Sequence, residues 1–266
     1  METKLWELVQ RVSTLSPLVL NLTNYVVMNN TANALLAAGA SPIMAHARPE
    51  LHDMVSISSA VVINIGTLDE YWSDCMYTAA REANAACKPW VLDPVGAGAS
   101  NFRNEVCAAL LGYRPALIRG NASEIMALAG ISNAGTKGVD STAASNEALA
   151  AAYALAAAYG SAVCISGATD IITNGSDTLY LRNGDPMMTK VTGLGCTASA
   201  LCGAFLGVSD EPLPAAAAAM SMLAIAGELA AAASNGPGSM QVQLLDALYT
   251  LDEATFLQRI NISSHA

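Results

Sequence analysis

The feature that most constrains the fold of this chain is a repeated alternation of short apolar runs with longer helical patterns. Most of the short runs are continuously apolar, which is typical of strands covered on both faces. They span residues 17–20, 42–45, 60–65, 90–93, 116–119 and 162–165, and helical patterns span 31–38, 70–86, 101–111 and 142–159. The alternation predicts an α/β fold, with a mainly parallel central sheet and helices on both faces.

The pattern changes toward the end of the chain. Residues 170–173 and 178–181 flank the turn-forming run Asn-Gly-Ser-Asp and predict a β-hairpin. Beyond Gly195 the chain is almost entirely helical, and the long apolar stretch at 213–233 is rich in Ala and contains Glu228. We expect that stretch to be a buried helix rather than a membrane span. No linker or repeat divides the sequence, so we expect a single domain over residues 1–266.

Composition excludes several classes of protein. Hydrophobic residues make up 53% of the chain and charged residues 13%, which argues against disorder. The formal net charge of -10 argues against a nucleic-acid partner, although a phosphorylated small ligand can still bind locally. The six cysteines form no CxxC pair and the three histidines stand in no metal motif, which favours reduced thiols and argues against zinc. The first residues are amphipathic rather than apolar, so we expect a cytoplasmic protein without a secretory signal.

The strongest local signal is the segment from Gly193 to Cys196. Glycines allow the backbone to approach a ligand, and the free N–H groups of a following helix attract an anion, so Gly195 could stabilise a phosphoryl group in transit. Cys196 would lie at the helix start, where a thiolate is favoured and could accept a proton from an attacking alcohol. A tight turn with a buried Cys explains the same residues. The segment also fits the G-x-G-x-x-A dinucleotide pattern, but it comes late in the chain and no strand with an acidic residue follows.

A second group of polar residues follows two predicted strands. Asp93 ends one strand and Glu124 begins a helix, so together they could hold a hydrated Mg²⁺ beside ATP phosphates, which Arg119 could reach directly. The alternative is structural: Asn121 with Glu124 forms a helix-capping pattern, and Asp93 before Pro94 could form a turn.

Two residues near the first strands are also candidates. Asn24 could hydrogen-bond a ring or cap the next helix, and Met44 could belong to the core or to an apolar pocket wall. No G-x-x-x-x-G-K-[ST] motif occurs, which excludes a Walker-type ATP site.

Taken together, six motifs resemble the hydroxyethylthiazole kinases of the ribokinase-like superfamily in order and approximate spacing. The similarity runs from about residue 15 to residue 250, and six motifs in register are highly specific. They are NLTN at 21–24, AAGASPIM at 37–44, NIGTL at 64–68, LDPVG at 92–96, RGNASE at 119–124 and GLGC at 193–196.

The resemblance implies a three-layer α/β/α fold and ATP-dependent phosphorylation of 4-methyl-5-(2-hydroxyethyl)thiazole, a salvage step toward thiamine. It also implies Mg²⁺ and a homotrimer with substrate sites between subunits. By position, Met44 and Gly193 would contact the thiazole. Arg119 and Ser166 would contact ATP, with Asn121 beside them. Asp93 and Glu124 would serve the metal–phosphate network, and Cys196 stands where many relatives place an Asp base.

The sequence departs from the family pattern at three places. Leu194 replaces the commoner Thr, Ser166 replaces Thr, and Met240 stands where Phe is more familiar. These changes leave the reaction class intact. Two other hypotheses stay open: a kinase acting on another small hydroxyalkyl heterocycle, and a catalytically weak member that binds thiazole or nucleotide for regulation.

Overall fold

The computed structural model describes residues 1–130 and 141–265. Their strands form one nine-stranded sheet in the order β2-β1-β3-β4-β5-β6-β7-β8-β9. Neighbouring strands from β2 to β6 pair in parallel, and those from β6 to β9 pair antiparallel, so the predicted mainly parallel sheet is confirmed. The strands are β1 (Leu18–Leu22), β2 (Ser41–Ile43), β3 (Ala60–Asn64), β4 (Trp90–Asp93), β5 (Leu117–Asn121), β6 (Ala162–Ser166), β7 (Asp170–Thr173), β8 (Thr178–Leu181) and β9 (Ile262–His265).

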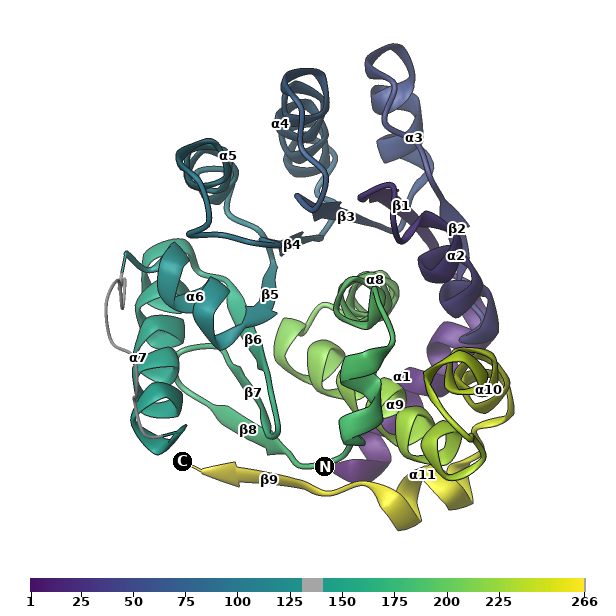
Figure 1. The fold of residues 1–266 in the computed structure, drawn as a ribbon. Helices are drawn as coiled ribbons and strands as arrows, with labels where there is room; N and C mark the ends of the chain where they lie inside the picture. The colour runs from purple at the N-terminus through teal and green to yellow at the C-terminus, as the bar shows by residue number, and fades with distance from the viewer. Residues whose placement is uncertain (131–140, 266) are drawn as a thin grey trace.

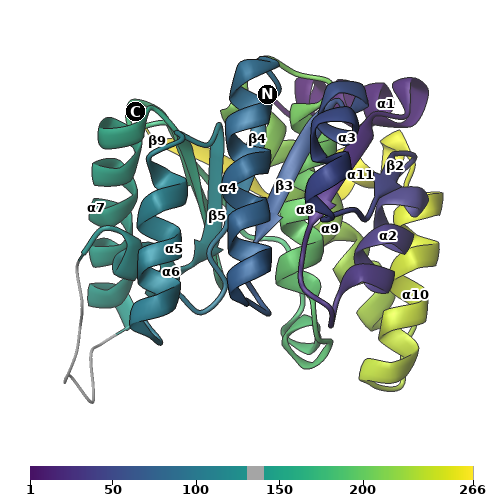
Figure 2. The same cartoon turned by 90° about the horizontal axis from the view of Figure 1, so that it is seen from above.

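Helices cover both faces of this sheet, which gives the three-layer α/β/α architecture (Figure 1). Turning the molecule shows α3 to α7 on one side of the sheet and α1, α8, α9 and α11 on the other (Figure 2). The helices are α1 (Glu2–Leu15), α2 (Met28–Ala37), α3 (Leu51–Ile57), α4 (Glu70–Ala85), α5 (Asn101–Leu111), α6 (Ala122–Leu128), α7 (Ser141–Tyr159), α8 (Leu194–Leu206), α9 (Pro212–Ala232), α10 (Pro237–Thr250) and α11 (Glu253–Arg259), with short 3₁₀ turns η1 (Arg48–Glu50) and η2 (Pro186–Lys190).

The two helical layers explain why the strands are continuously apolar. Successive side chains of a strand point to opposite faces. In β3, Val62 packs into the core under α8 and α9, whereas Val61 and Ile63 pack into the core under α3 and α4. Both faces of the strand are therefore shielded from water, so the strand needs apolar residues at every position.

Helix α8 lies very close to the sheet. A Cβ atom at Gly203 would stand only 2.5 Å from Cγ2 of Val62, so only glycine permits this approach. Further toward the start of α8, Ser199 reaches Asp93 at the end of β4. The packing therefore brings the N-terminus of α8 to the carboxyl ends of the central strands.

The apolar stretch predicted to be buried forms α9. This helix is long and apolar enough to cross a membrane, but 83% of its most apolar window is buried inside the protein. It contacts α8 and α10 and strands β6 to β8. Its apolar character is thus that of a core helix, as expected.

The main differences from the sequence expectations lie at the edges. The strand β9 lies within the region expected to be almost entirely helical. Its residues Ile262-Ser263-Ser264 carry little apolar pattern, and they pair with β8 as an edge strand. The helix expected at 31–38 begins at Met28, with Val27 at its N-cap. Asn24 therefore does not cap that helix.

Candidate active site

The polar residues singled out from the sequence gather at the carboxyl ends of neighbouring parallel strands. Asp93 ends β4, Asn121 ends β5 and Ser166 ends β6, and Arg119 lies within β5. Such strand ends are where open α/β sheets bind ligands. The start of α8, with Gly193, faces the same edge.

A chain of hydrogen bonds joins the loop after β1 to the ends of β3 and β4 and to α8. Asn24 Nδ2 donates to Asn64 Oδ1 at 2.8 Å, and Asn64 Nδ2 donates to Asp93 Oδ2 at 2.6 Å. Ser199 Oγ donates to the same Asp93 oxygen at 2.8 Å. The carboxylate of Asp93 is therefore held by one amide from β3 and one hydroxyl from α8. It is not exposed in a turn before Pro94, because Asp93 is only 1% exposed.

Backbone groups fix which way the two amides point. Gly66 N donates to Asn64 Oδ1 at 2.9 Å, so the Nδ2 of Asn64 must face Asp93. Val26 N donates to Asn24 Oδ1 at 3.1 Å, which turns the Nδ2 of Asn24 toward Asn64. Arg103 on α5 steadies this loop by donating to the carbonyl of Gly66 at 2.7 Å. The amide donors of Asn24 and Asn64 thus both point along the hydrogen-bond chain toward Asp93.

Burial weakens the acidity of Asp93. Loss of hydration raises the pKa of Asp93 to about 6, although the charge of Arg119 and the hydrogen bond from Ser199 act in the opposite direction. A carboxyl with this pKa is largely ionised at pH 7. Asp93 can therefore present negative charge to a cation at neutral pH.

Cys196 lies in the first turn of α8, next to this chain. Asn24 Nδ2 approaches its Sγ at 3.5 Å. Burial, with a smaller contribution from the negative charge of Asp93, raises the pKa of the Cys196 thiol to about 11. The helix N-terminus does not overcome these effects, so the group is a thiol at neutral pH.

Arg119 is a buried cation with spare hydrogen-bonding capacity. Its side chain is 7% exposed and its Nη2 donates to Ser166 Oγ at 2.7 Å. Its Nε has no partner among the described residues. A Cβ at Gly195 would stand 2.8 Å from Arg119 Nη1, so glycine at 195 lets the guanidinium lie against the start of α8. Buried guanidinium N–H groups left unpaired favour an anionic ligand.

Asn121 and Glu124 form the capping box that the sequence left open as an alternative. Glu124 N donates to Asn121 Oδ1 at 3.0 Å, and Asn121 N donates to Glu124 Oε2 at 2.9 Å. The other Glu124 oxygen accepts from Gly96 N at 2.9 Å, which joins the loop after β4 to α6. Glu124 therefore has a clear structural role, and its charge also acts on Asp93.

Met44 and Gly193 lie farther toward the β2 edge. Met44 directly follows β2 and is half-buried. Gly193 has a left-handed φ of 81°, and a Cβ there would stand 2.6 Å from Val27, so a larger residue is excluded on two grounds. Of the predicted substrate-binding residues, Asn24 is the one that contacts Cys196.

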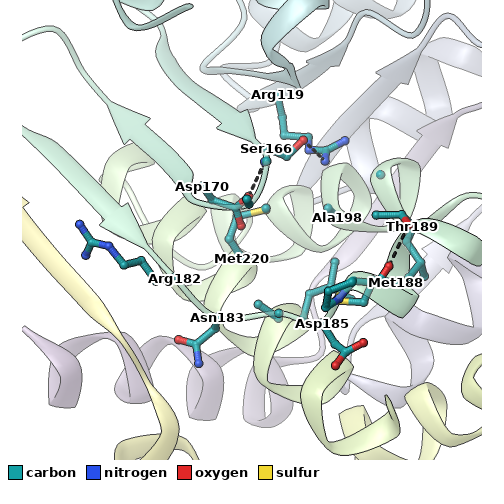
Figure 3. A pocket seen from close by; sticks show the side chains of 18 residues that line it. Arg119, Ser166, Asp170, Arg182, Asn183, Asp185, Met188, Thr189, Ala198 and Met220 are labelled. Carbon is teal, nitrogen blue, oxygen red and sulfur yellow. Dashed lines mark hydrogen bonds between the residues drawn. The ribbon is translucent and has the colours of Figure 1, made fainter. Parts of the chain in front are cut away.

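A cavity of about 580 Å³ opens beside Arg119 (Figure 3). Its polar lining includes Arg119 and Ser166, which face the first turn of α8. Apolar side chains form another part of its wall, among them Met188, Met220, Leu223 and Ala224. The cavity wall is therefore amphiphilic.

Within the described residues, the cavity lining includes Arg119, Ser166 and Gly195 but not the other predicted site residues. Asn24, Cys196 and Asp93 are joined by the hydrogen-bond chain on one side of the start of α8. The predicted residues thus fall into two groups, one lining the cavity and one beside it.

Sequence reasoning missed several functional candidates. Asn64 ends β3 just as Asp93 ends β4, so its strand-end position was the signal that could have found it. Asp170 begins β7 and lines the cavity, and Gly167 N donates to its Oδ1 at 3.0 Å. Burial raises the pKa of Asp170 to about 6. Met188 and Met220 gave no signal, because isolated methionines in apolar stretches are indistinguishable from core residues.

The described part of the chain contains no group of three or more His, Cys, Asp and Glu side chains placed to hold a metal ion. Magnesium, however, commonly binds through one or two carboxylates with water and phosphate completing its shell.

The fold is shared with small-molecule kinases of the ribokinase-like type. A structure of pyridoxal kinase from Staphylococcus aureus in complex with AMP-PCP and pyridoxal superposes with a TM-score of 0.61 at 17% identity, covering 80% of this chain and 88% of that one. That likeness concerns the fold alone.

Closer relatives identify the family. A hydroxyethylthiazole kinase structure from Pyrococcus horikoshii has a TM-score of 0.92 and 41% identity, covering 99% of this chain and 100% of that one. Hydroxyethylthiazole kinases from Leptospira biflexa and Syntrophus aciditrophicus are 55% and 52% identical, over 92% and 97% of this chain and 92% and 96% of their own lengths. The model of the hydroxyethylthiazole kinase family matches residues 9–254. The chain belongs to the hydroxyethylthiazole kinase family, and is thus a kinase.

Proposed function

We propose that this chain transfers the γ-phosphoryl group of ATP to the hydroxyl of 4-methyl-5-(2-hydroxyethyl)thiazole, a salvage step toward thiamine. The observation that carries the proposal is the buried Arg119, which lines an amphiphilic cavity and whose Nε has no hydrogen-bond partner among the described residues. Family membership supplies the reaction class and the acceptor.

The nucleotide would lie along the cavity. Its phosphates would meet Arg119 and the N–H groups at the start of α8, where no described side chain caps the helix. Ser166 would contact ATP while holding Arg119, and Asn121 lies at the neighbouring strand end. The base would rest on the apolar wall around Met220. Charge and shape thus support the same orientation.

The thiazole alcohol would approach from the side of Asn24. Met44 and Gly193 would contact its ring, and Cys196 and Gly195 would bracket the point of transfer. Because the thiol of Cys196 is neutral at pH 7, its part is to position the hydroxyl. Proton loss from the alcohol can come late in a loose phosphoryl transfer, so positioning and charge stabilisation account for most of the rate.

The residues present fit Mg²⁺ as part of the ATP complex. Asp93 supplies a carboxylate that is ionised at neutral pH, and Glu124 has both oxygens already bonded to backbone N–H groups. Asp93 would therefore hold the ion more directly, and Glu124 would act through its charge or through water. When bound, Mg²⁺ neutralises the phosphate oxygens and so favours transfer.

We further propose a homotrimer with the thiazole site between subunits. Tyr25 and Val26, directly after Asn24, are 60% and 62% exposed, and a second copy of the chain could cover them. Sedimentation or light scattering would test the assembly, and a monomer that is fully active would overturn it. The chain would act as one kinase domain over residues 1–266 in the cytoplasm.

The function is tested by ADP release from Mg·ATP with the thiazole alcohol, with a hydroxymethylpyrimidine, and with neither. ADP release that requires the thiazole alcohol supports the proposal. Release that prefers the pyrimidine would assign a different acceptor. Binding without turnover over a panel of alcohols would assign the chain to a regulatory role.

A further inference from the structure

The apolar part of the cavity wall offers a nucleotide base few hydrogen-bonding groups. Its wall includes Leu194, Met188, Met220, Leu223 and Ala224, and these side chains have no strong donor or acceptor. Methionine is flexible and polarisable, so such a wall adapts to rings of different outline. The binding energy from such a contact depends on the area of the base and hardly on the hydrogen-bonding groups along its edge.

The amide nearest this wall is already saturated with hydrogen bonds. Asn183 Nδ2 donates to Glu228 Oε1 at 2.8 Å and to the carbonyl of Arg259 at 2.9 Å. Asn183 Oδ1 accepts from Asn261 N at 2.7 Å. Both amide hydrogens are thus consumed. Figure 3 shows the side chains of Asn183 and Arg182 turned away from Met220.

Other polar groups of the rim also serve the fold. Gly184 N donates to Glu228 Oε1 at 3.0 Å. Asp185 Oδ1 accepts from Met187 N at 2.8 Å, and Thr189 Oγ1 donates to the carbonyl of Pro186 at 2.8 Å. These bonds shape the 3₁₀ turn η2. If these groups bonded to a base instead, the η2 turn would lose the hydrogen bonds that hold it.

The rim itself faces solvent. Arg182, Gly184, Pro186 and Thr189 are all exposed and line the cavity. Polar atoms on the edge of a bound base can therefore be satisfied by water, whether they are donors or acceptors. The polar edge of guanine therefore loses no more hydrogen bonds on binding than the polar edge of adenine.

From these observations we propose that this kinase selects its phosphoryl donor by the triphosphate and by stacking area, and that it accepts GTP and ITP nearly as well as ATP. The inference deepens the proposed function and rests on it. Strong discrimination between substrates comes from buried polar groups that the wrong substrate leaves unpaired, and an apolar pocket discriminates weakly.

The experiment is a comparison of kcat/KM for ATP, GTP and ITP as magnesium complexes, with the thiazole alcohol saturating. We expect the three values to agree within about 10-fold, as for a pocket without base-specific hydrogen bonds. A preference for ATP of about 100-fold or more, in an active enzyme, would overturn the inference and leave the proposed function intact. No turnover with any donor would overturn both.

A wall variant gives a second readout. Met188 packs against Gly227 of α9 and forms part of the wall, so Met188→Ala should raise KM for ATP and GTP by the same factor. Met54→Ala on α3 is the matched control, because Met54 is a half-buried methionine outside the cavity. A change in the ATP-to-GTP ratio of about 10-fold in Met188→Ala would show that the wall reads the base, and would contradict the inference.

Discussion

Asn64 and Asp93 are register partners at the ends of β3 and β4, and Asn64 Nδ2 donates to Asp93 Oδ2 at 2.6 Å. The contact joins a neutral amide to a buried carboxylate. Because Gly66 N fixes the opposite side of the amide, the donor cannot turn away without losing a second bond. The acidity and direction of the Asp93 carboxylate thus depend on Asn64.

Asn64→Ala should therefore damage both stability and catalysis. Removing one donor from a buried carboxylate costs about 1–3 kcal/mol of unfolding free energy. If Asp93 holds the magnesium–phosphate group, kcat/KM for Mg·ATP should fall about 10–100-fold. Urea unfolding and steady-state kinetics measure the two effects, with exposed Asn101→Ala as the control.

The same variant should move the pH profile. The hydrogen bond from Asn64 lowers the pKa of Asp93, so its loss raises that pKa above about 6. The acid limb of kcat/KM, which we assign to protonation of Asp93, should then shift to higher pH. A loss of activity with an unmoved acid limb would assign Asn64 a purely structural role.

Gly195→Ala tests the contact between α8 and Arg119. A Cβ at this position would stand 2.8 Å from Arg119 Nη1, so the guanidinium must shift. We expect kcat/KM for ATP to fall by about 100-fold, because misplacement of about an ångström has that effect on transfer. Gly238→Ala, where a Cβ meets nothing within 4 Å, is the control and should keep normal kinetics. Equal activity of the two variants would show that Arg119 is not held for catalysis.

Cys196→Ala separates a base from a positioning group. With the pKa of the thiol near 11, wild-type kcat/KM should be flat between pH 7 and 9. The variant should turn over more slowly, yet remain measurably active with the same flat profile. A basic-side rise in that pH range which disappears in Cys196→Ala would restore the thiolate as a base. Unchanged turnover would dismiss Cys196 both as a base and as a positioning group.

The sequence predicted the layers and the mainly parallel sheet, and it placed the candidate site residues at the carboxyl ends of the strands. Continuous apolar runs and the strand-end position of Asp93 carry that information locally. Arg119, expected to end its strand, lies within β5. The sequence did not predict that both carboxylate oxygens of Glu124 would accept hydrogen bonds from backbone N–H groups. The bond from Gly96 joins segments far apart in the chain. Nor did the sequence predict the raised pKa of Cys196, because burial depends on the whole packing of α8.

The wall of the cavity escaped the sequence for a similar reason. Met188 and Met220 lie on different elements, and both line the cavity only because η2 packs against α9 at Gly227. Asp170 began a predicted hairpin strand, and its burial beside Arg119 follows from tertiary structure alone.

Asp170 should make stability depend on pH with a definite sign. Burial raises the pKa of Asp170 from 3.8 to about 6, so the folded state binds the proton more tightly than the unfolded state. The stabilising contribution is complete below about pH 4 and is lost as pH rises through about 6. Relative to Asp170→Asn, the wild type should lose about 2 kcal/mol between pH 4 and pH 7. Urea unfolding at several pH values measures this difference, and exposed Asp246→Asn is the control. Parallel curves for wild type and Asp170→Asn would contradict it.

The measurement that tests the central claim most directly is the transfer of label from [γ-³²P]ATP to 4-methyl-5-(2-hydroxyethyl)thiazole, with the product identified by mass. The account predicts labelled thiazole phosphate that forms only when Mg·ATP and the alcohol are both present, and that nearly vanishes in Gly195→Ala. Label released as inorganic phosphate, or transferred equally well by Gly195→Ala, would contradict it.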